Sequence, residues 1–130
     1  KRKEIAHLYD QLIDKIDWLE KPFTESDSEH GYQAYVCLFK PEQIIPSNVK
    51  KISDMRNKFM DYLQSIGIST RPGTHSVHML EYYRKKYNFR PEDFPASNIA
   101  SGCSIALPLF PALSNAEFDY ISESIRKYEL

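Results

Sequence analysis

The chain has 130 residues, of which 42% are hydrophobic and 13% are aromatic. This composition excludes an intrinsically disordered protein, and the length suits one domain with its own core. The 17 basic and 18 acidic residues leave a formal net charge of -1. Because proteins that bind nucleic acid usually carry a basic excess, we expect no nucleic-acid partner.

The sequence has no apolar run long enough to span a bilayer and no signal peptide, so we expect no membrane partner. Cys37 and Cys103 stand far apart in apolar surroundings, and we interpret them as two buried thiols of a cytoplasmic protein rather than a disulfide. The chain enters a helical pattern at once and has no initiator Met. We therefore expect it to have been cut from a longer protein.

The first third of the chain predicts a helix followed by a strand. A polar loop over residues 24–30 follows Pro22, and the aromatic and β-branched residues of 31–39 predict a buried strand. The helix precedes this loop. It is predicted because apolar side chains recur every three or four residues along it. They are Ile5, Leu8, Tyr9, Leu12, Ile13, Ile16 and Leu19.

The middle of the chain predicts a second helix over about 47–66, because apolar residues form one stripe along it. Gly67 is placed for a left-handed helix cap, and residues 68–71 then leave as a short strand. A third helix is predicted over 77–87 and a short fourth helix over 95–102.

The last third predicts an extended segment over 104–110, with Pro108 marking a strand end or an edge. A final helix starts at Ser114, which forms a capping-box pattern with Glu117. We therefore predict an α+β domain over 1–130: a small antiparallel or mixed sheet of about three strands, with helices packed on one face.

The chemistry of the chain concentrates on the segment "TRPGTHSVH", residues 70–78. Pro72 and Gly73 fit the centre of a type II turn, which would fold Arg71 back towards Thr74 and His75. A cation, hydroxyls, an imidazole and a helix N-terminus together favour a phosphate or a carboxylate. In the alternative interpretation, Arg71 pairs with a nearby carboxylate and the histidines bond to the backbone.

Other patterns carry less chemistry. His75 and His78 are three residues apart, but no Cys or acidic residue has the spacing to complete a metal site, so we predict none. Tyr82, Tyr83 and Tyr87 have helical spacing, which favours the core and its edge. The basic run over 84–86 is typical of a solvated helix face. Nucleotide-binding glycine motifs and a nucleophile elbow are absent.

A resemblance to a known family spans essentially the whole chain. The segments "GISTRPGTHSVH", "MLEYYR" and "EDFPASNIASGCSIALPLFPALSNAEFDYISESIRK" are similar to the C-terminal part of the DegT/DnrJ/EryC1/StrS aminotransferases. The helix "KRKEIAHLYDQLIDKI" resembles the family's helix that joins the large domain to the small one. By this resemblance, the inter-domain helix would cover residues 1–19. The strand "GYQAYVCLF" is similar to the first strand of the small domain.

The resemblance implies the small domain of a fold-type-I enzyme, usually a homodimer, that depends on pyridoxal phosphate. A lysine of the large domain holds the cofactor, and an amino group passes from an amino acid to a keto-sugar linked to a nucleotide. That lysine would lie upstream of Lys1, so this segment alone is expected to be inactive. The rival hypothesis is a stand-alone α+β module that binds a phosphorylated or nucleotide ligand.

The resemblance also implies the site residues. The family pattern reads G-I-x-T-x-x-H-Y-x-P-x-H, which Gly67, Ile68, Thr70 and His78 match. The family's first histidine falls on Gly73, so this chain is a variant. The resemblance places the loop at the mouth of the active site, where the substrate-binding residues would be Arg71, Thr74, His75 and His78. Asn98 stands where an acidic residue is common.

Overall fold

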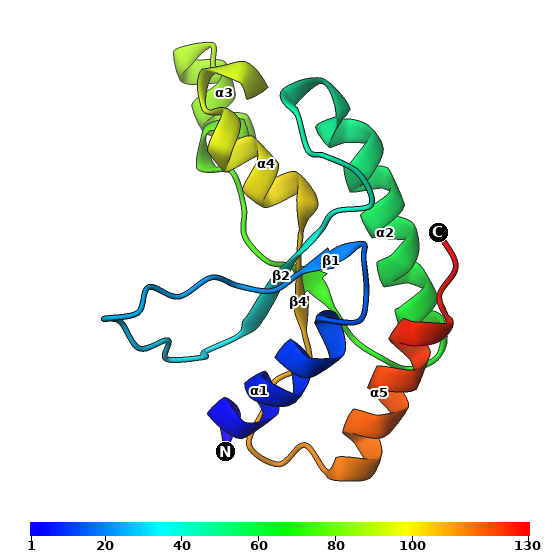
Figure 1. Ribbon diagram of the computed structural model, residues 1–130. Coiled ribbons are helices and arrows are strands. Elements are labelled where there is room, and N and C mark those ends of the chain that lie inside the picture. The colour runs from blue at the N-terminus through cyan, green and yellow to red at the C-terminus, as the bar shows by residue number, and fades with distance from the viewer.

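The computed structural model describes residues 1–130 and shows an α+β fold (Figure 1). Most elements follow the predicted chain order, and one short strand is added. The α-helices are α1 (Arg2–Ile13), α2 (Val49–Ser65), α3 (Glu81–Tyr87), α4 (Pro95–Cys103) and α5 (Asn115–Lys127). The strands are β1 (Leu19–Glu20), β2 (Tyr35–Phe39), β3 (Arg71–Pro72) and β4 (Ser104–Leu107). Short 3-10 helices cover Pro46–Asn48 (η1), Val77–Met79 (η2) and Pro91–Asp93 (η3).

The sheet has four strands in the order β1-β2-β4-β3, and every neighbouring pair is antiparallel. The sequence predicted about three strands, and the strand it missed is β1. The first helix ends at Ile13 rather than at Leu19, because the chain turns and Leu19 then pairs with Phe39. Ile16 and Leu19 stay buried after the helix ends, so their spacing imitates a longer helix.

Three helices, α1, α2 and α5, pack on one face of the sheet, as predicted (Figure 1). Aromatic side chains of these helices and of β2 fill the layer between them. Tyr9 of α1 stacks on Tyr35 of β2 with ring centroids 4.8 Å apart, and Phe118 of α5 meets the Tyr9 ring at 5.0 Å. Phe59 of α2 packs 5.9 Å from Phe39 at the other end of β2. Burying these side chains removes a large apolar area from water and stabilises the layer.

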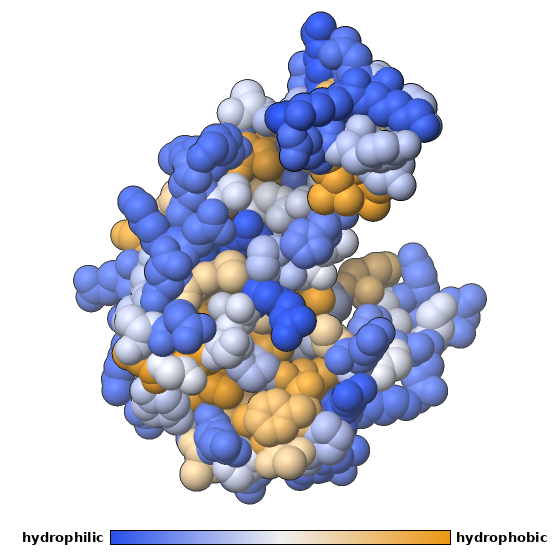
Figure 2. Space-filling view, turned by 180° about the vertical axis from the view of Figure 1, so that it is seen from behind, coloured by the Kyte–Doolittle hydropathy of each residue, from blue (hydrophilic) through white to orange (hydrophobic).

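Residues 77–103, which include α3 and α4, extend beyond the end of the sheet, and we call them the α3–α4 projection (Figure 1). Figure 2 shows the molecule from behind, where the projection stands off from the body and the surface is hollowed below it. The outer surface of the projection is hydrophilic in this view, and apolar side chains gather on its underside.

The local signals of the sequence act as predicted. Gly67 has a φ of 82°, and its left-handed conformation lets the Ile68 N–H donate to the Leu63 carbonyl at 2.8 Å. At the start of α5, the Glu117 N–H donates to Ser114 Oγ at 3.2 Å, and the Ser114 N–H donates to the Glu117 carboxylate at 2.8 Å. The predicted capping box is therefore confirmed.

Both cysteines are buried and free, as the sequence predicted. Burial raises the pKa of the Cys37 thiol to about 12, and this thiol lies within 3.8 Å of the Ile105 carbonyl. A thiol with so high a pKa is not a nucleophile near neutral pH. None of the helices combines the length and the apolar content needed to cross a bilayer.

Candidate functional site

The segment that starts the candidate site is an edge strand, so the predicted type II turn at Pro72-Gly73 is wrong. Arg71 lies opposite Ala106 and Pro72 lies opposite Ile105 in the β3–β4 pair. Gly73 continues this direction, because its N–H donates to the Ser104 carbonyl at 3.4 Å, and it does not have a positive φ. Proline lacks an N–H, and an edge strand tolerates it because one side of the strand needs no partner.

Gly73 is needed for space rather than for a turn. A Cβ atom at this position would lie 2.3 Å from Val36 Cγ1 and 2.7 Å from Ser104 Oγ. The backbone of residue 73 therefore passes directly over the β2 and β4 side chains, and only glycine allows that approach. The same contact fixes where the chain leaves the sheet and enters the loop that carries His75.

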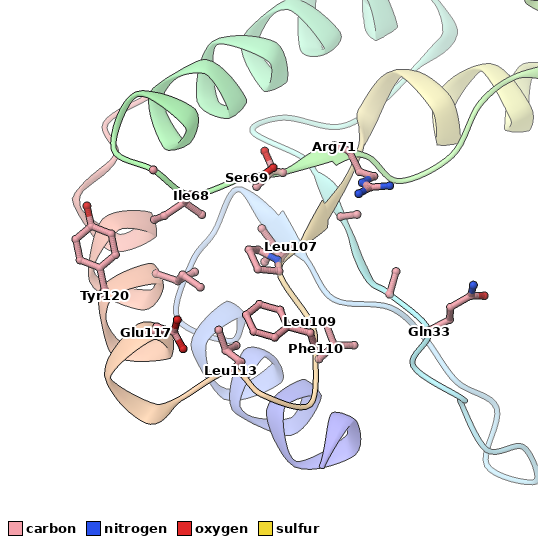
Figure 3. Close-up of a pocket in the computed structure, with 16 residues that line it drawn as sticks. Gln33, Ile68, Ser69, Arg71, Leu107, Leu109, Phe110, Leu113, Glu117 and Tyr120 are labelled. Carbon is pink, nitrogen blue, oxygen red and sulfur yellow. The ribbon is translucent and has the colours of Figure 1, made fainter.

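Arg71 is an exposed cation at the edge of the sheet. It lines a hollow of about 680 Å³, together with apolar residues of the segment after β4 and of α5. In Figure 3, Arg71 projects from β3, while Tyr120 and Glu117 come from α5 and Leu109 lies between the two sides. This volume is within the range of small-molecule sites in proteins.

Thr74 and His75 are exposed on the loop that follows β3. The next residue, Ser76, is buried and donates from its hydroxyl to the Ser97 carbonyl of α4 at 2.7 Å. This bond ties the loop to the α3–α4 projection just after His75. The loop is therefore held at both ends, at Gly73 and at Ser76, with two polar side chains presented between them.

His78 differs from the other predicted residues because it is buried, with an exposed fraction of 7%. Its ring lies 4.9 Å from the ring of Phe94, and its Nε2 atom is buried without a hydrogen-bond partner. A buried polar atom without a partner is uncommon in folded proteins and calls for an explanation.

The structure places the four predicted residues along one stretch but not around one cavity. Arg71 faces the 680 Å³ hollow. His75 lines a hollow of about 650 Å³ between α2 and the projection and, with His78, a smaller hollow on the projection, and Thr74 lines none of the three. Every ion pair of the chain joins a lysine to a carboxylate, so Arg71 has no acidic partner. The alternative in which Arg71 pairs with a carboxylate is therefore excluded.

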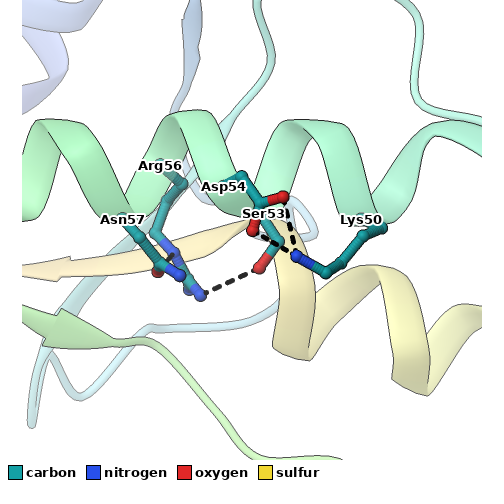
Figure 4. Close-up of polar contacts among 5 residues, drawn as sticks. All are labelled: Lys50, Ser53, Asp54, Arg56 and Asn57. Carbon is teal, nitrogen blue, oxygen red and sulfur yellow. Dashed lines mark hydrogen bonds and ion pairs between the residues drawn. The ribbon is translucent and has the colours of Figure 1, made fainter.

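Arg56 of α2 is a buried cation that the sequence analysis did not single out. It is 4% exposed and donates to the carbonyls of Ser104 at 2.6 Å and Ser101 at 3.3 Å, at the C-terminal end of α4. Figure 4 shows its contacts within α2 with Ser53 and Asn57. The sequence contained one signal that Arg56 is buried. Arg56 follows Ile52 by four residues, which places it on the apolar stripe of the helix.

The prediction that the α3 tyrosines belong to the core or its edge is wrong. Tyr82 and Tyr87 are 63% and 53% exposed, and Tyr83 is 38% exposed. Helix α3 buries none of its residues, because it belongs to the projection and not to the layer on the sheet. The basic run over 84–86 is exposed, as predicted. No group of three His, Cys, Asp or Glu side chains is arranged to hold a metal ion.

The sequence of this chain matches a known protein family. The model of the DegT/DnrJ/EryC1/StrS aminotransferase family matches residues 1–126. The chain belongs to this family. The resemblance found in the sequence is therefore confirmed over nearly its full length.

Two curated relatives and one solved structure illustrate the match. The spore coat polysaccharide biosynthesis protein SpsC of Bacillus subtilis is 25% identical over 97% of this chain and 31% of its own length. The GDP-perosamine synthase of Escherichia coli O157:H7 is 28% identical over 98% of this chain and 30% of its own length. The PLP form of the putative sugar aminotransferase Spr1654 from Streptococcus pneumoniae superposes with a TM-score of 0.77 at 22% identity, over 95% of this chain and 29% of that one. The chain thus spans about 30% of the length of the curated relatives it matches.

Proposed function

We propose that this chain is the C-terminal small domain of a pyridoxal-phosphate-dependent aminotransferase that acts on a nucleotide-linked keto-sugar, and that the domain closes over the active site. One observation carries the proposal: the family match covers residues 1–126, while the chain spans about 30% of its relatives' length. In this proposal the whole enzyme is a cytoplasmic homodimer that takes its amino group from an amino-acid donor.

The residues of this chain do not fit a cofactor site of their own. A lysine that holds pyridoxal phosphate would need an amine that is desolvated or otherwise activated. No lysine of the chain is buried, and Lys40, one of the less exposed, is paired with Glu20. We therefore assign the cofactor to the remainder of the enzyme and expect this segment alone to be inactive.

The proposal gives the loop over 71–78 the role of a lid that contacts substrate. Arg71, Thr74 and His75 are exposed, and they make no contact with an acidic side chain of their own chain. Their donors are free to bind the hydroxyls or the phosphates of a sugar nucleotide. The anchors at Gly73 and Ser76 hold the loop in place while it does so.

The test uses the full-length protein that carries this chain. Arg71→Ala and His75→Ala are each expected to lower kcat/KM for a nucleotide-linked keto-sugar by about tenfold or more, the loss typical of a hydrogen bond to a charged group. The absorbance of the bound cofactor should not change. Arg126→Ala, on the exposed face of α5, is the matched control and should leave turnover unaltered.

Unchanged kinetics in both loop variants would remove the loop from the proposal. A full-length protein that carries no cofactor-binding lysine would refute the aminotransferase assignment itself. In that case, binding of a nucleotide by this chain would favour the rival hypothesis of a stand-alone ligand-binding module.

A further inference from the structure

The α3–α4 projection carries a small hollow with aromatic walls. Its volume is about 320 Å³, and its walls include Tyr83, Phe89 and Phe94. We call it the aromatic pocket. The rings of Phe89 and Phe94 lie 5.3 Å apart and nearly perpendicular, at 88°, so they form two walls of a corner rather than one stack. Its size is at the small end of the range for ligand sites.

One polar group of the aromatic pocket lacks a partner inside the chain. His78 forms one side of the pocket, and its buried Nε2 makes no hydrogen bond. Ser97 also lines the pocket, and its hydroxyl has only a 3.4 Å contact with the Ser76 hydroxyl. Phe94, which lies against the His78 ring, is 46% exposed. Phe94 therefore presents an exposed ring beside the His78 imidazole.

The chemistry of the lining favours a flat ring over a sugar. No carboxylate or amide side chain lines the pocket, although these groups are the usual partners of several adjacent hydroxyls. Aromatic faces with a few hydrogen-bonding groups are typical of sites that hold a base. Basic residues stand nearby on α3, where Lys86 lies 5.3 Å from the centroids of the Tyr82 and Tyr87 rings.

We propose that the aromatic pocket binds the nucleobase of the nucleotide-linked substrate, with the ring against Phe94 and the His78 imidazole and the Ser97 hydroxyl at its polar edge. The inference rests on the proposed function, which supplies a nucleotide-linked substrate.

The experiment measures equilibrium binding of three probes, UMP, dTMP and GMP, to the full-length protein, with ribose 5-phosphate as the probe without a base. At least one nucleotide should bind, and ribose 5-phosphate should bind at least tenfold more weakly. Phe94→Leu should weaken nucleotide binding by about tenfold or more, as expected for the loss of a stacking contact. Phe23→Leu is the matched control, because Phe23 is 81% exposed on a loop outside the pocket.

A second readout guards against a variant that does not fold. In the wild-type protein, the imidazole NMR signals of His78 should shift when the nucleotide is added, and those of exposed His7 should not. Equal affinity for ribose 5-phosphate, an unaltered affinity in folded Phe94→Leu, or unshifted His78 signals would each overturn the inference. Transamination by an enzyme that fails these tests would leave the proposed function standing and remove only the base site.

Discussion

At the scale of single residues, the site depends on side chains whose surroundings are set by distant parts of the chain. Glycine is required at position 73 because Val36 and Ser104, which lie on two other strands, leave no space for a side chain. His78 is the only predicted site residue that is buried, and it lies against Phe94, sixteen positions further along the sequence. The family pattern marked the histidine, but no local signal indicated what surrounds it.

Gly73→Ala should destabilise the fold. The added Cβ would overlap Val36 and Ser104, and overpacking of this kind costs about 1–3 kcal/mol. Urea unfolding followed by the fluorescence of Trp18, the single tryptophan, measures the change. Gly31→Ala is the matched control, because nothing lies within 4 Å of its Cβ position, and it should change stability by less than about 0.5 kcal/mol. Equal stabilities of the two variants would contradict the steric argument.

At the scale of elements, local capping decides where helices begin and end, and these features were predictable. The capping box at Ser114 and the left-handed Gly67 are short-range interactions, so three or four residues specify each of them. The start of the first helix and most of its buried stripe were also predictable, although Leu8, which was expected in that stripe, is 38% exposed. The end of this helix was not predictable, because Ile16 and Leu19 remain in the core after the backbone has left the helix.

The capping box should make α5 sensitive to acid. Hydrogen bonds from the backbone and the hydroxyl of Ser114 hold the pKa of Glu117 below its ordinary value of 4.5. The folded state therefore prefers the charged carboxylate, and its contribution to stability is present above pH 4.5 and is lost as the pH falls through the lowered pKa. Glu117→Gln should destabilise the protein at pH 7, and the difference from wild type should shrink at pH 3.

Urea unfolding at the two pH values tests this expectation, with Glu129→Gln as the control for a charge removed outside the capping box. The control should differ little from wild type at either pH. The contrary result is a difference in the free energy of unfolding between Glu117→Gln and wild type that is as large at pH 3 as at pH 7. It would show that the carboxylate charge does not stabilise the capping box.

At the scale of the whole molecule, the protein has a body and a projection that are joined by few polar contacts. The body is the four-stranded sheet with α1, α2 and α5 on one face. The polar contacts of the projection with the body are the Ser76–Ser97 hydrogen bond and the bonds of Arg56, which reaches from α2 to the end of α4. Apolar packing joins the two as well, because Cys103 of α4 belongs to the core and Ile99 packs against it. Arg71 and the aromatic pocket lie on different sides of this junction.

Arg56→Met should weaken the junction. Burial lowers the pKa of Arg56, yet its guanidinium still donates to the carbonyls of Ser101 and Ser104. Methionine removes these bonds and leaves the Ser104 carbonyl only the 3.4 Å bond from the Gly73 N–H. Losing the hydrogen bonds of a charged donor should cost about 2–3 kcal/mol. Amide hydrogen exchange should become faster in α4 than in α1. Arg126→Met, an exposed position on α5, should have no comparable effect. Unchanged exchange in α4 would show that apolar packing alone holds the projection.

The sequence by itself determined the α+β class, most of the chain order of the elements, both helix-terminal signals and the family, because these depend on periodicity and on contacts between near neighbours. Only the tertiary structure decided that Gly73 follows an edge strand and has no space for a side chain, that the α3 tyrosines are exposed and that Arg56 is buried. Pairing and burial depend on which surfaces meet, and in these three cases the surfaces belong to segments far apart in the chain.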